Sequence, residues 1–202
     1  MSREARGAQL LDVAEKLFAG QGFDGTSMED IARAAGVTRQ VVYAHHPSKD
    51  AVFVACVRRA RGELEAGIRE PEIMIEAGAG MDVVIQRAGE IFFGLLERDP
   101  QRWAVLFDPG TALAPGPTEE LATMRRRTIG RIEQMVRHFS PDDGAAADEV
   151  RDVAFAHAIS GVGEQLGRWW IANPELPRER VIGLYRDFIT GGLASRLPTK
   201  EA

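Results

Sequence analysis

Apolar residues recur along this chain at intervals of three and four positions, which is the spacing of one face of an α-helix. Near the N-terminus Leu10, Ala14, Leu17 and Phe18 form such a stripe, which stops at residues 20–22. No stretch alternates between apolar and polar residues as a half-buried strand does. The pattern therefore predicts an all-α protein.

A second helix is predicted over residues 26–35. Thr26 and Glu29 have the spacing of a capping box, in which the Thr26 hydroxyl accepts from the Glu29 amide and the Glu29 carboxylate reaches back. The apolar face of this helix consists of Met28, Ile31, Ala32 and Ala35. Gly36 follows, and glycine suits the left-handed conformation at which many helices end.

A short third helix is predicted to begin at Thr38 and to end before Pro47. Ser48 is expected to cap a fourth helix, with Asp50 well placed in its first turn. We expect this helix to end around residues 70–71. Its inward stripe consists of Phe53, Val57, Ala60 and Leu64.

The rest of the chain is predicted to form longer helices separated by segments that contain proline and glycine. These helices span residues 81–98, 102–107, 119–139, 147–172 and 178–196. The simplest architecture is two helical units joined through the long fourth helix, with domains at residues 3–63 and 64–202.

Composition fits a globular protein of one or two domains: 202 residues, 45% hydrophobic and 27% charged. The single cysteine, Cys56, leaves no internal disulfide framework and indicates a reducing compartment. No apolar run approaches the ~18 residues that a membrane span needs. The first residues form a charged amphipathic stretch, unlike the apolar core of a signal peptide. These features predict a cytoplasmic protein.

The charge of the chain is unevenly distributed. A net charge of -5 argues against a protein that binds nucleic acid along its whole length. However, no acidic residue occurs from Arg33 through Lys49, and the same interval contains Arg39, His45 and His46. Such an interval suits contact with a phosphate backbone, although a short acid-free run also arises by chance.

Two short helices joined by a turn at Gly36, with another helix packed behind them, have helix-turn-helix geometry. The second helix of such a pair enters the major groove and presents its N-terminal side chains to base edges. Here these side chains are Thr38, Arg39 and Gln40. Arginine can form two hydrogen bonds with guanine, and glutamine can do the same with adenine. The pattern predicts DNA binding, but it also fits other small helical bundles.

The order of residues is more specific than the helix pattern. It consists of Gly22-Phe23-Asp24-Gly25-Thr26-Ser27-Met28-Glu29-Asp30-Ile31-Ala32, Ala35-Gly36-Val37-Thr38, Tyr43 and Pro47-Ser48-Lys49-Asp50-Ala51-Val52. This order closely resembles the N-terminal domain of the TetR family of bacterial transcriptional regulators, over roughly residues 6–56. The resemblance implies a DNA-binding regulator with a helical C-terminal domain for ligand binding and dimerisation.

The resemblance also implies which residues contact DNA. Thr26 and Ser27, at the start of the second helix, would meet a phosphate. Arg39 and Gln40 would read or approach bases. The residues that would hold the DNA backbone are Tyr43, His45 and Lys49. The family usually has an aromatic residue, most often Phe, where this chain has His46. A histidine fills that site only if its ring nitrogens find partners. It either loosens the third helix or adds a backbone contact.

The resemblance implies a small-molecule cavity in the second domain and a homodimer. The candidates for the cavity are Phe92, Trp103, Phe107, Met124, Phe155 and His157. The candidates for the dimer interface lie in the last two helices: Trp169, Trp170, Leu184, Phe188 and Ile189. The implied function is a repressor that leaves a near-palindromic DNA operator when a small apolar or amphipathic ligand binds.

No cofactor, metal or catalytic role is expected. His45 and His46 are adjacent on a helix and point about 100° apart, which suits one metal ion poorly. The glycines at 161, 163 and 167 resemble a dinucleotide fingerprint, but the third is one residue late and no strand precedes them. Two other function classes stay open: a helical protein-interaction module without DNA binding, and an enzyme that uses the helical cavity.

Overall fold

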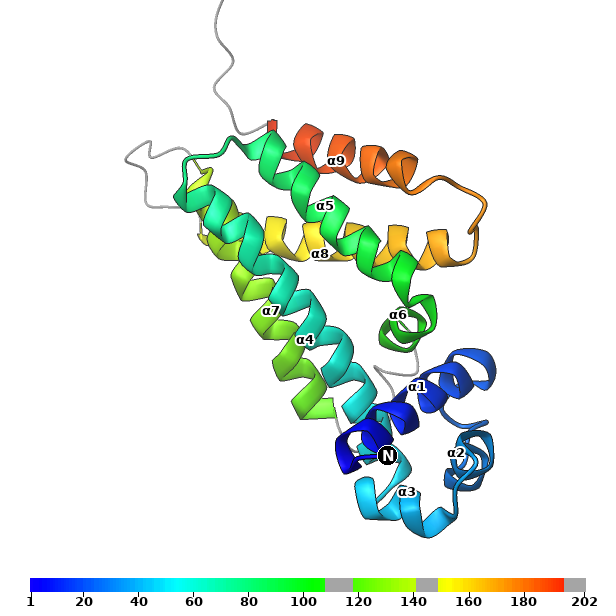
Figure 1. Ribbon diagram of the computed structural model, residues 1–202. Coiled ribbons are helices and arrows are strands. Elements are labelled where there is room, and N and C mark those ends of the chain that lie inside the picture. Colours follow the sequence, from blue (N-terminus) through cyan, green and yellow to red (C-terminus); the bar gives the residue numbers. More distant parts are fainter. Residues whose placement is uncertain (108–117, 141–148, 195–202) are drawn as a thin grey trace, which may run out of the picture. The chain divides into compact units, whose positions relative to one another are not determined.

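The computed structural model describes residues 1–107, 118–140 and 149–194, and every regular element in these ranges is an α-helix, as predicted (Figure 1). In chain order the helices are α1 (Arg3–Gln21), α2 (Met28–Ala35), α3 (Arg39–His45), α4 (Lys49–Glu76), α5 (Met81–Arg98), α6 (Pro100–Phe107), α7 (Thr118–His138), α8 (Glu149–Ile171) and α9 (Arg178–Ala194). None of them is long and apolar enough to cross a lipid bilayer. The predicted helices agree with these bounds to within a few residues, except at the end of α4.

The helices form two compact units. The first comprises Met1–Glu63 and Asp99–Met124, and the second comprises Leu64–Arg98 and Arg125–Ala202. The sequence predicted a division after residue 63 but assigned α6 to the second domain. In the structure α6 lies against α1 within the first unit (Figure 1), and Val105 of α6 is buried in the same core as the apolar face of α1.

The core of the first unit confirms the apolar stripes of α1, α2 and α4. The side chains of Leu10 and Ile31 are fully buried in it, and Phe53, Val57 and Cys56 of α4 are buried beside them. Val42 anchors α3 to the same core and is also fully buried. Four helices that follow one another in sequence are therefore held together by one set of apolar contacts.

The expectation that α4 ends around Pro71 was wrong, because the helix continues to Glu76. Proline lacks an amide hydrogen and leaves one carbonyl of the preceding turn without its helical donor. Arg131 of α7 bridges the turns on either side of this proline. Its guanidinium donates to the Glu65 carbonyl at 2.6 Å and to both Glu72 carboxylate oxygens at 2.7 and 2.6 Å. Tertiary contacts thus support a helix that local propensity would end.

In the second unit α5 packs against α9 and α8, and α8 and α9 pack against each other. The ring of Phe93 is fully buried and meets Trp170 and Tyr185 edge to face, with centroids 5.8 and 5.7 Å apart. Gly89 of α5 lies directly under the Tyr185 ring, since a β-carbon at residue 89 would be 3.2 Å from it. This small residue lets α5 and α9 approach closely.

Candidate nucleic-acid interface

Helix α2 is capped one residue later than the sequence predicted. The Ser27 hydroxyl accepts from the Asp30 amide at 3.1 Å, and the Ser27 amide donates to the Asp30 carboxylate at 3.0 Å. The Ser27 hydroxyl also donates to the Asp30 carboxylate, and this bond, together with that from the Ser27 amide, lowers the pKa of Asp30. Thr26 is only 2% exposed and donates to the Gly22 carbonyl at 2.8 Å. The predicted capping box between Thr26 and Glu29 was therefore wrong, and Thr26 is too buried to meet a phosphate.

The turn between α2 and α3 has the predicted glycine at its centre. Gly36 adopts φ 66° and ψ 36°, the left-handed conformation that glycine reaches without strain. The amide of Val37 then donates to the Ala32 carbonyl at 3.0 Å. Thr38 follows as the residue that precedes α3, and within the described ranges its side chain makes no capping hydrogen bond. Its hydroxyl is thus available to a partner outside the chain.

The first turn of α3 presents polar side chains to solvent. Thr38, Arg39 and Gln40 are all exposed, whereas Val42 on the opposite side is fully buried. Tyr43, one turn after Arg39, is 44% exposed. The helix is therefore anchored by its apolar side while the three side chains predicted to face bases stay accessible.

The interval from Arg33 through Lys49 contains no acidic residue, but in the folded protein acidic side chains lie next to two of its arginines. Glu29 lies 3.4 Å from the Arg39 guanidinium, and Asp30 lies 3.4 Å from that of Arg33. Both acids come from α2, just before the interval: the turn at Gly36 brings Glu29 alongside Arg39, whereas Asp30 and Arg33 lie one turn apart on α2 itself. Exposed ion pairs of this kind contribute little in water. The two arginines can therefore exchange these partners for phosphate or base oxygens at small cost.

The remaining predicted contacts are partly buried. His45 is half-buried against Gly7 of α1, and His46 is half-buried next to it. Burial lowers the pKa of His46, and the nearby charges of His45 and Arg58 lower it further. Lys49 is also half-buried, and its ammonium donates to a backbone carbonyl of its own chain. These three residues border the exposed surface of α3, and each also packs within the first unit.

The six residues predicted to line a ligand cavity do not fall into one group. Three belong to the first unit (Trp103, Phe107 and Met124) and three to the second (Phe92, Phe155 and His157). Trp103 and Phe107 are buried, with ring centroids 6.0 Å apart. His157, one of the cavity candidates, is exposed on α8 and does not face the interior of the second unit. It shares an outward stripe of that helix with Val150 and Val153 at helical spacing.

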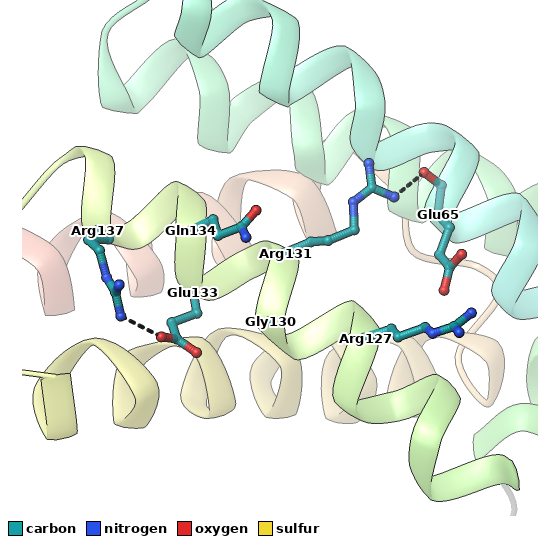
Figure 2. A pocket seen from close by; sticks show the side chains of 7 residues that line it. All are labelled: Glu65, Arg127, Gly130, Arg131, Glu133, Gln134 and Arg137. Carbon is teal, nitrogen blue, oxygen red and sulfur yellow. Dashed lines mark hydrogen bonds and ion pairs between the residues drawn. The ribbon is translucent and has the colours of Figure 1, made fainter.

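A groove of about 440 Å³ lies in the second unit (Figure 2). Figure 2 shows that α7 supplies its lining apart from one residue of α4: Glu65, Arg127, Gly130, Arg131, Glu133, Gln134 and Arg137. Two of the three arginines are already paired, Arg131 with Glu72 and Arg137 with Glu133 at 2.7 Å. The lining is polar and includes none of the six predicted residues, so this groove is not the apolar cavity that the sequence suggested.

Three of the predicted interface residues are exposed: Trp169 (43%), Leu184 (45%) and Phe188 (65%). Ile189 and Trp170 are buried, so the expectation that they face a partner was wrong. Trp170 instead packs on Phe93 and donates to the Leu176 carbonyl at 2.9 Å. Both helices carry apolar residues on two sides, and the pattern alone did not show which side faces inward.

In the part of the chain that the structure describes, no three His, Cys, Asp or Glu side chains lie together in a way that could hold a metal ion. Cys56 is buried in the first unit, and burial raises the pKa of its thiol. The chemistry that the structure offers is therefore that of the exposed turn of α3: hydrogen-bond donors and cations at the start of a helix.

Comparisons with known proteins agree with this arrangement. Residues 10–56, which contain most of α1 through the start of α4, match the family described as bacterial regulatory proteins, tetR family. The chain is 24% identical over 195 residues to the HTH-type transcriptional activator FasR of Mycolicibacterium smegmatis, covering 96% of this chain and 85% of FasR. It is 35% identical over 68 residues to the HTH-type transcriptional repressor KstR2 of Rhodococcus jostii, covering 34% and 33% of the two chains.

The fold is shared with solved structures. The crystal structure of a TetR-like transcriptional regulator from Rhodococcus sp. RHA1 aligns with a TM-score of 0.77 and 24% identity, covering 96% of this chain and 98% of that one. The family match covers the helix-turn-helix, and the exposed turn of α3 lies at its centre. The chain belongs to the TetR family of transcriptional regulators, and it is a DNA-binding regulator of transcription.

Proposed function

We propose that this regulator is a homodimeric repressor that occupies a near-palindromic operator and leaves it when a small apolar or amphipathic molecule binds the second unit. The observation that carries the proposal is the first turn of α3. Its polar side chains are exposed, while Val42 fixes the helix in the core. We place the protein in the cytoplasm, because the DNA that a bacterial regulator controls is there.

The proposed contacts divide by chemistry. Arg39 and Gln40 can each make two hydrogen bonds to a base edge, and Thr38 can bond a base or a phosphate. Ser27 lies at the N-terminus of α2, where free amides favour a phosphate. Tyr43 is exposed one turn further along α3 and suits the DNA backbone. We omit Thr26 from this set because it is buried.

The homodimer is supported by the outer side of α8 and α9. Trp169, Leu184 and Phe188 expose large apolar surfaces on two helices that pack together. Two copies of such a helix pair can bury these residues in a four-helix bundle with two-fold symmetry. A symmetric dimer would place its two reading helices about one DNA turn apart, ~34–36 Å.

A ligand site in the second unit is supported by its aromatic interior. Phe92 is half-buried on α5 and lies over Gly163 of α8, and it meets Phe93 edge to face at 5.1 Å. Phe155 is half-buried on α8. Aromatic side chains between helices suit an apolar or amphipathic molecule. We propose Phe92 and Phe155 as the first residues to test for ligand contact.

The deciding experiment is to sequence the DNA that the purified protein retains and to measure binding to it across salt. We expect a two-fold related sequence, a steep fall in affinity with salt, and a weaker complex when a compound found by thermal shift is added. A transcription assay on the retained promoter then gives the sign of regulation. A rise in transcription when the protein is added would make it an activator, as FasR is named.

The dimer is tested by Phe188→Glu, with Ile73→Glu as the matched control. Ile73 is 63% exposed on α4, which is not part of the proposed α8 and α9 interface. We expect Phe188→Glu to yield monomers in analytical ultracentrifugation, while Ile73→Glu stays dimeric. A wild-type protein that is monomeric yet binds its operator tightly would exclude the dimer. The absence of any salt-dependent DNA binding would favour a protein-interaction module.

A further inference from the structure

A buried cluster of charged side chains joins α1, α4 and α6 inside the first unit. At its centre is Glu15 of α1, which is only 4% exposed. Arg59 of α4 donates from Nε to Glu15 Oε1 at 3.0 Å, and its Nη2 lies 2.5 Å from Oε2. Arg102 of α6 donates from Nε to both Glu15 oxygens, at 3.3 and 3.2 Å. One carboxylate therefore receives two guanidinium groups from two other helices.

Arg102 also contacts carboxylates beyond Glu15. Its Nη1 donates to Glu63 of α4, and to Asp99, the residue that precedes α6, at 3.1 Å. Its Nη2 lies 3.8 Å from Asp12 of α1. The guanidinium group is planar and carries five donors in fixed directions, so one arginine can hold several acceptors in a set arrangement. Arg102 thus holds α1 and α4 to α6.

Helix α1, which this cluster holds in place, also packs against the two helices of the helix-turn-helix, α2 and α3. α1 buries Leu10 and Phe18 in the core that contains Ile31 of α2 and Val42 of α3. A shift of α1 therefore displaces the surface on which α2 and α3 rest. Glu15 lies on the buried side of α1, so a movement of α1 away from α4 and α6 would return its carboxylate to water.

The electrostatics make this arrangement sensitive to Arg102. Burial raises the pKa of Glu15, and Arg59 and Arg102 act against that rise. A buried carboxylate that loses a partner is strongly destabilising, because its desolvation is no longer offset. Without Arg102, Glu15 keeps Arg59 alone, and moving α1 toward water becomes the cheaper arrangement.

We propose that Arg102 is a positioning residue for DNA binding: it fixes α1 against α4 and α6 and so holds the helix-turn-helix in its binding arrangement, without touching DNA. The proposal rests on operator binding by the wild-type protein, which is measured first and independently. Arg102 lies far outside residues 10–56, the part of the chain that matches the family.

The test compares four full-length variants: Arg102→Met, Arg102→Lys, Glu15→Gln, and Arg102→Met combined with Glu15→Gln. Operator affinity is measured across salt at a temperature where circular dichroism shows each variant folded. We expect Arg102→Met to weaken operator binding by about tenfold or more, since it leaves a buried charge unbalanced. The salt slope should not change, because no phosphate contact is lost. Adding Glu15→Gln should restore most of the affinity, and Arg102→Lys should lie between Arg102→Met and the wild type.

Arg131→Met is the matched control, because it removes an arginine with three bonds to α4 in the second unit. We expect it to change operator affinity by less than about twofold, since Arg131 and its partners Glu65 and Glu72 all belong to the second unit and share no partner with the Glu15 cluster. If Arg102→Met is unfolded, Arg102→Lys and the double variant carry the comparison. Wild-type affinity in folded Arg102→Met or Arg102→Lys would overturn the proposal. So would a flatter salt slope, which would make Arg102 a phosphate contact, or a double variant no better than Arg102→Met.

Discussion

The ammonium group of Lys49 donates a 2.8 Å hydrogen bond to the carbonyl oxygen of Phe23 and lies 4.2 Å from the centroid of the Phe23 ring. Lys49 is the first residue of α4, and Phe23 lies in the loop between α1 and α2. The Phe23 ring in turn packs on Phe18 and Phe53. The lysine therefore ties the entrance of the helix-turn-helix to α4, a role that the sequence did not suggest beside its expected phosphate contact.

We predict that Lys49→Ala destabilises the protein as well as weakening DNA binding. Loss of the charged hydrogen bond and the cation–π contact should lower the free energy of unfolding by about 1–2 kcal/mol. Urea unfolding measures this directly. Lys16→Ala, at an exposed position of α1, removes the same charge and should leave stability unchanged within about 0.5 kcal/mol. An unchanged stability in Lys49→Ala, with a salt slope flatter by about one per half-site, would reduce Lys49 to a phosphate contact.

Arg39→Ala should behave in the opposite way. Its guanidinium is exposed and lies 3.4 Å from Glu29 and 6.0 Å from the centroid of the Tyr43 ring, so stability should change by less than about 0.5 kcal/mol. Operator binding should fall by about 1–3 kcal/mol, and sequence preference should relax at one position of each half-site. Binding to operator and to scrambled DNA gives both quantities. Arg33→Ala, which removes an arginine paired with Asp30 on α2, is the control. Equal losses on both DNAs would place Arg39 on the backbone instead of a base.

His46→Phe should remove part of the pH dependence of stability. The pKa of His46 is lowered in the folded protein, so the unfolded chain binds more protons between that value and 6.5. Stability from this group is therefore complete above pH 6.5 and is lost as the pH falls through this window. The variant should show a flatter decline in unfolding free energy on acidification, whereas His138→Gln, at an exposed site, should keep the wild-type slope. Identical slopes for wild type and His46→Phe would contradict the assignment.

Two glycines of α4 should respond to alanine with opposite signs. Gly62 is exposed and a β-carbon there meets no atom within 4 Å, so Gly62→Ala should stabilise the helix by about 0.5–1 kcal/mol. A β-carbon at Gly67 would lie 2.6 Å from Cγ2 of Ile91, so Gly67→Ala should destabilise by about 1–3 kcal/mol. Thermal unfolding of the two variants side by side provides the measurement. A stabilising Gly67→Ala would mean that α5 yields at this contact.

The sequence predicted the helices well because their apolar periodicity and their capping residues are local. Gly36, Ser48 and Asp50 occupy the positions at helix ends that their residue types favour. The Ser48 hydroxyl, for example, accepts from the Ala51 amide at 3.1 Å. It failed where two local choices were nearly equal. Thr26 and Ser27 are both good caps, and only burial of Thr26 in the folded unit decides between them.

The candidate site was predictable in its exposed part and unpredictable in its connections. The position of Arg39 on a short helix after a glycine turn implied exposure, and the structure agrees. Its pairing with Glu29 depends on how the turn folds α2 back. The continuation of α4 past Pro71 and the outward position of His157 depend likewise on partners far away in sequence. Periodicity along one helix carries no information about such partners.

The first unit is assembled from two separate stretches of chain, and this has a consequence for how such regulators can exchange DNA specificity. A chimera that receives residues 1–63 from another protein would set a foreign α1 against the resident α6, with a mismatched partner for Arg102. Recombination at a single crossover would therefore impair the transplanted DNA-binding segment. Substitutions at Arg39 and Gln40 leave the contact between α1 and α6 intact. A new operator specificity is therefore acquired more easily by point mutation on α3 than by transplanting the N-terminal segment.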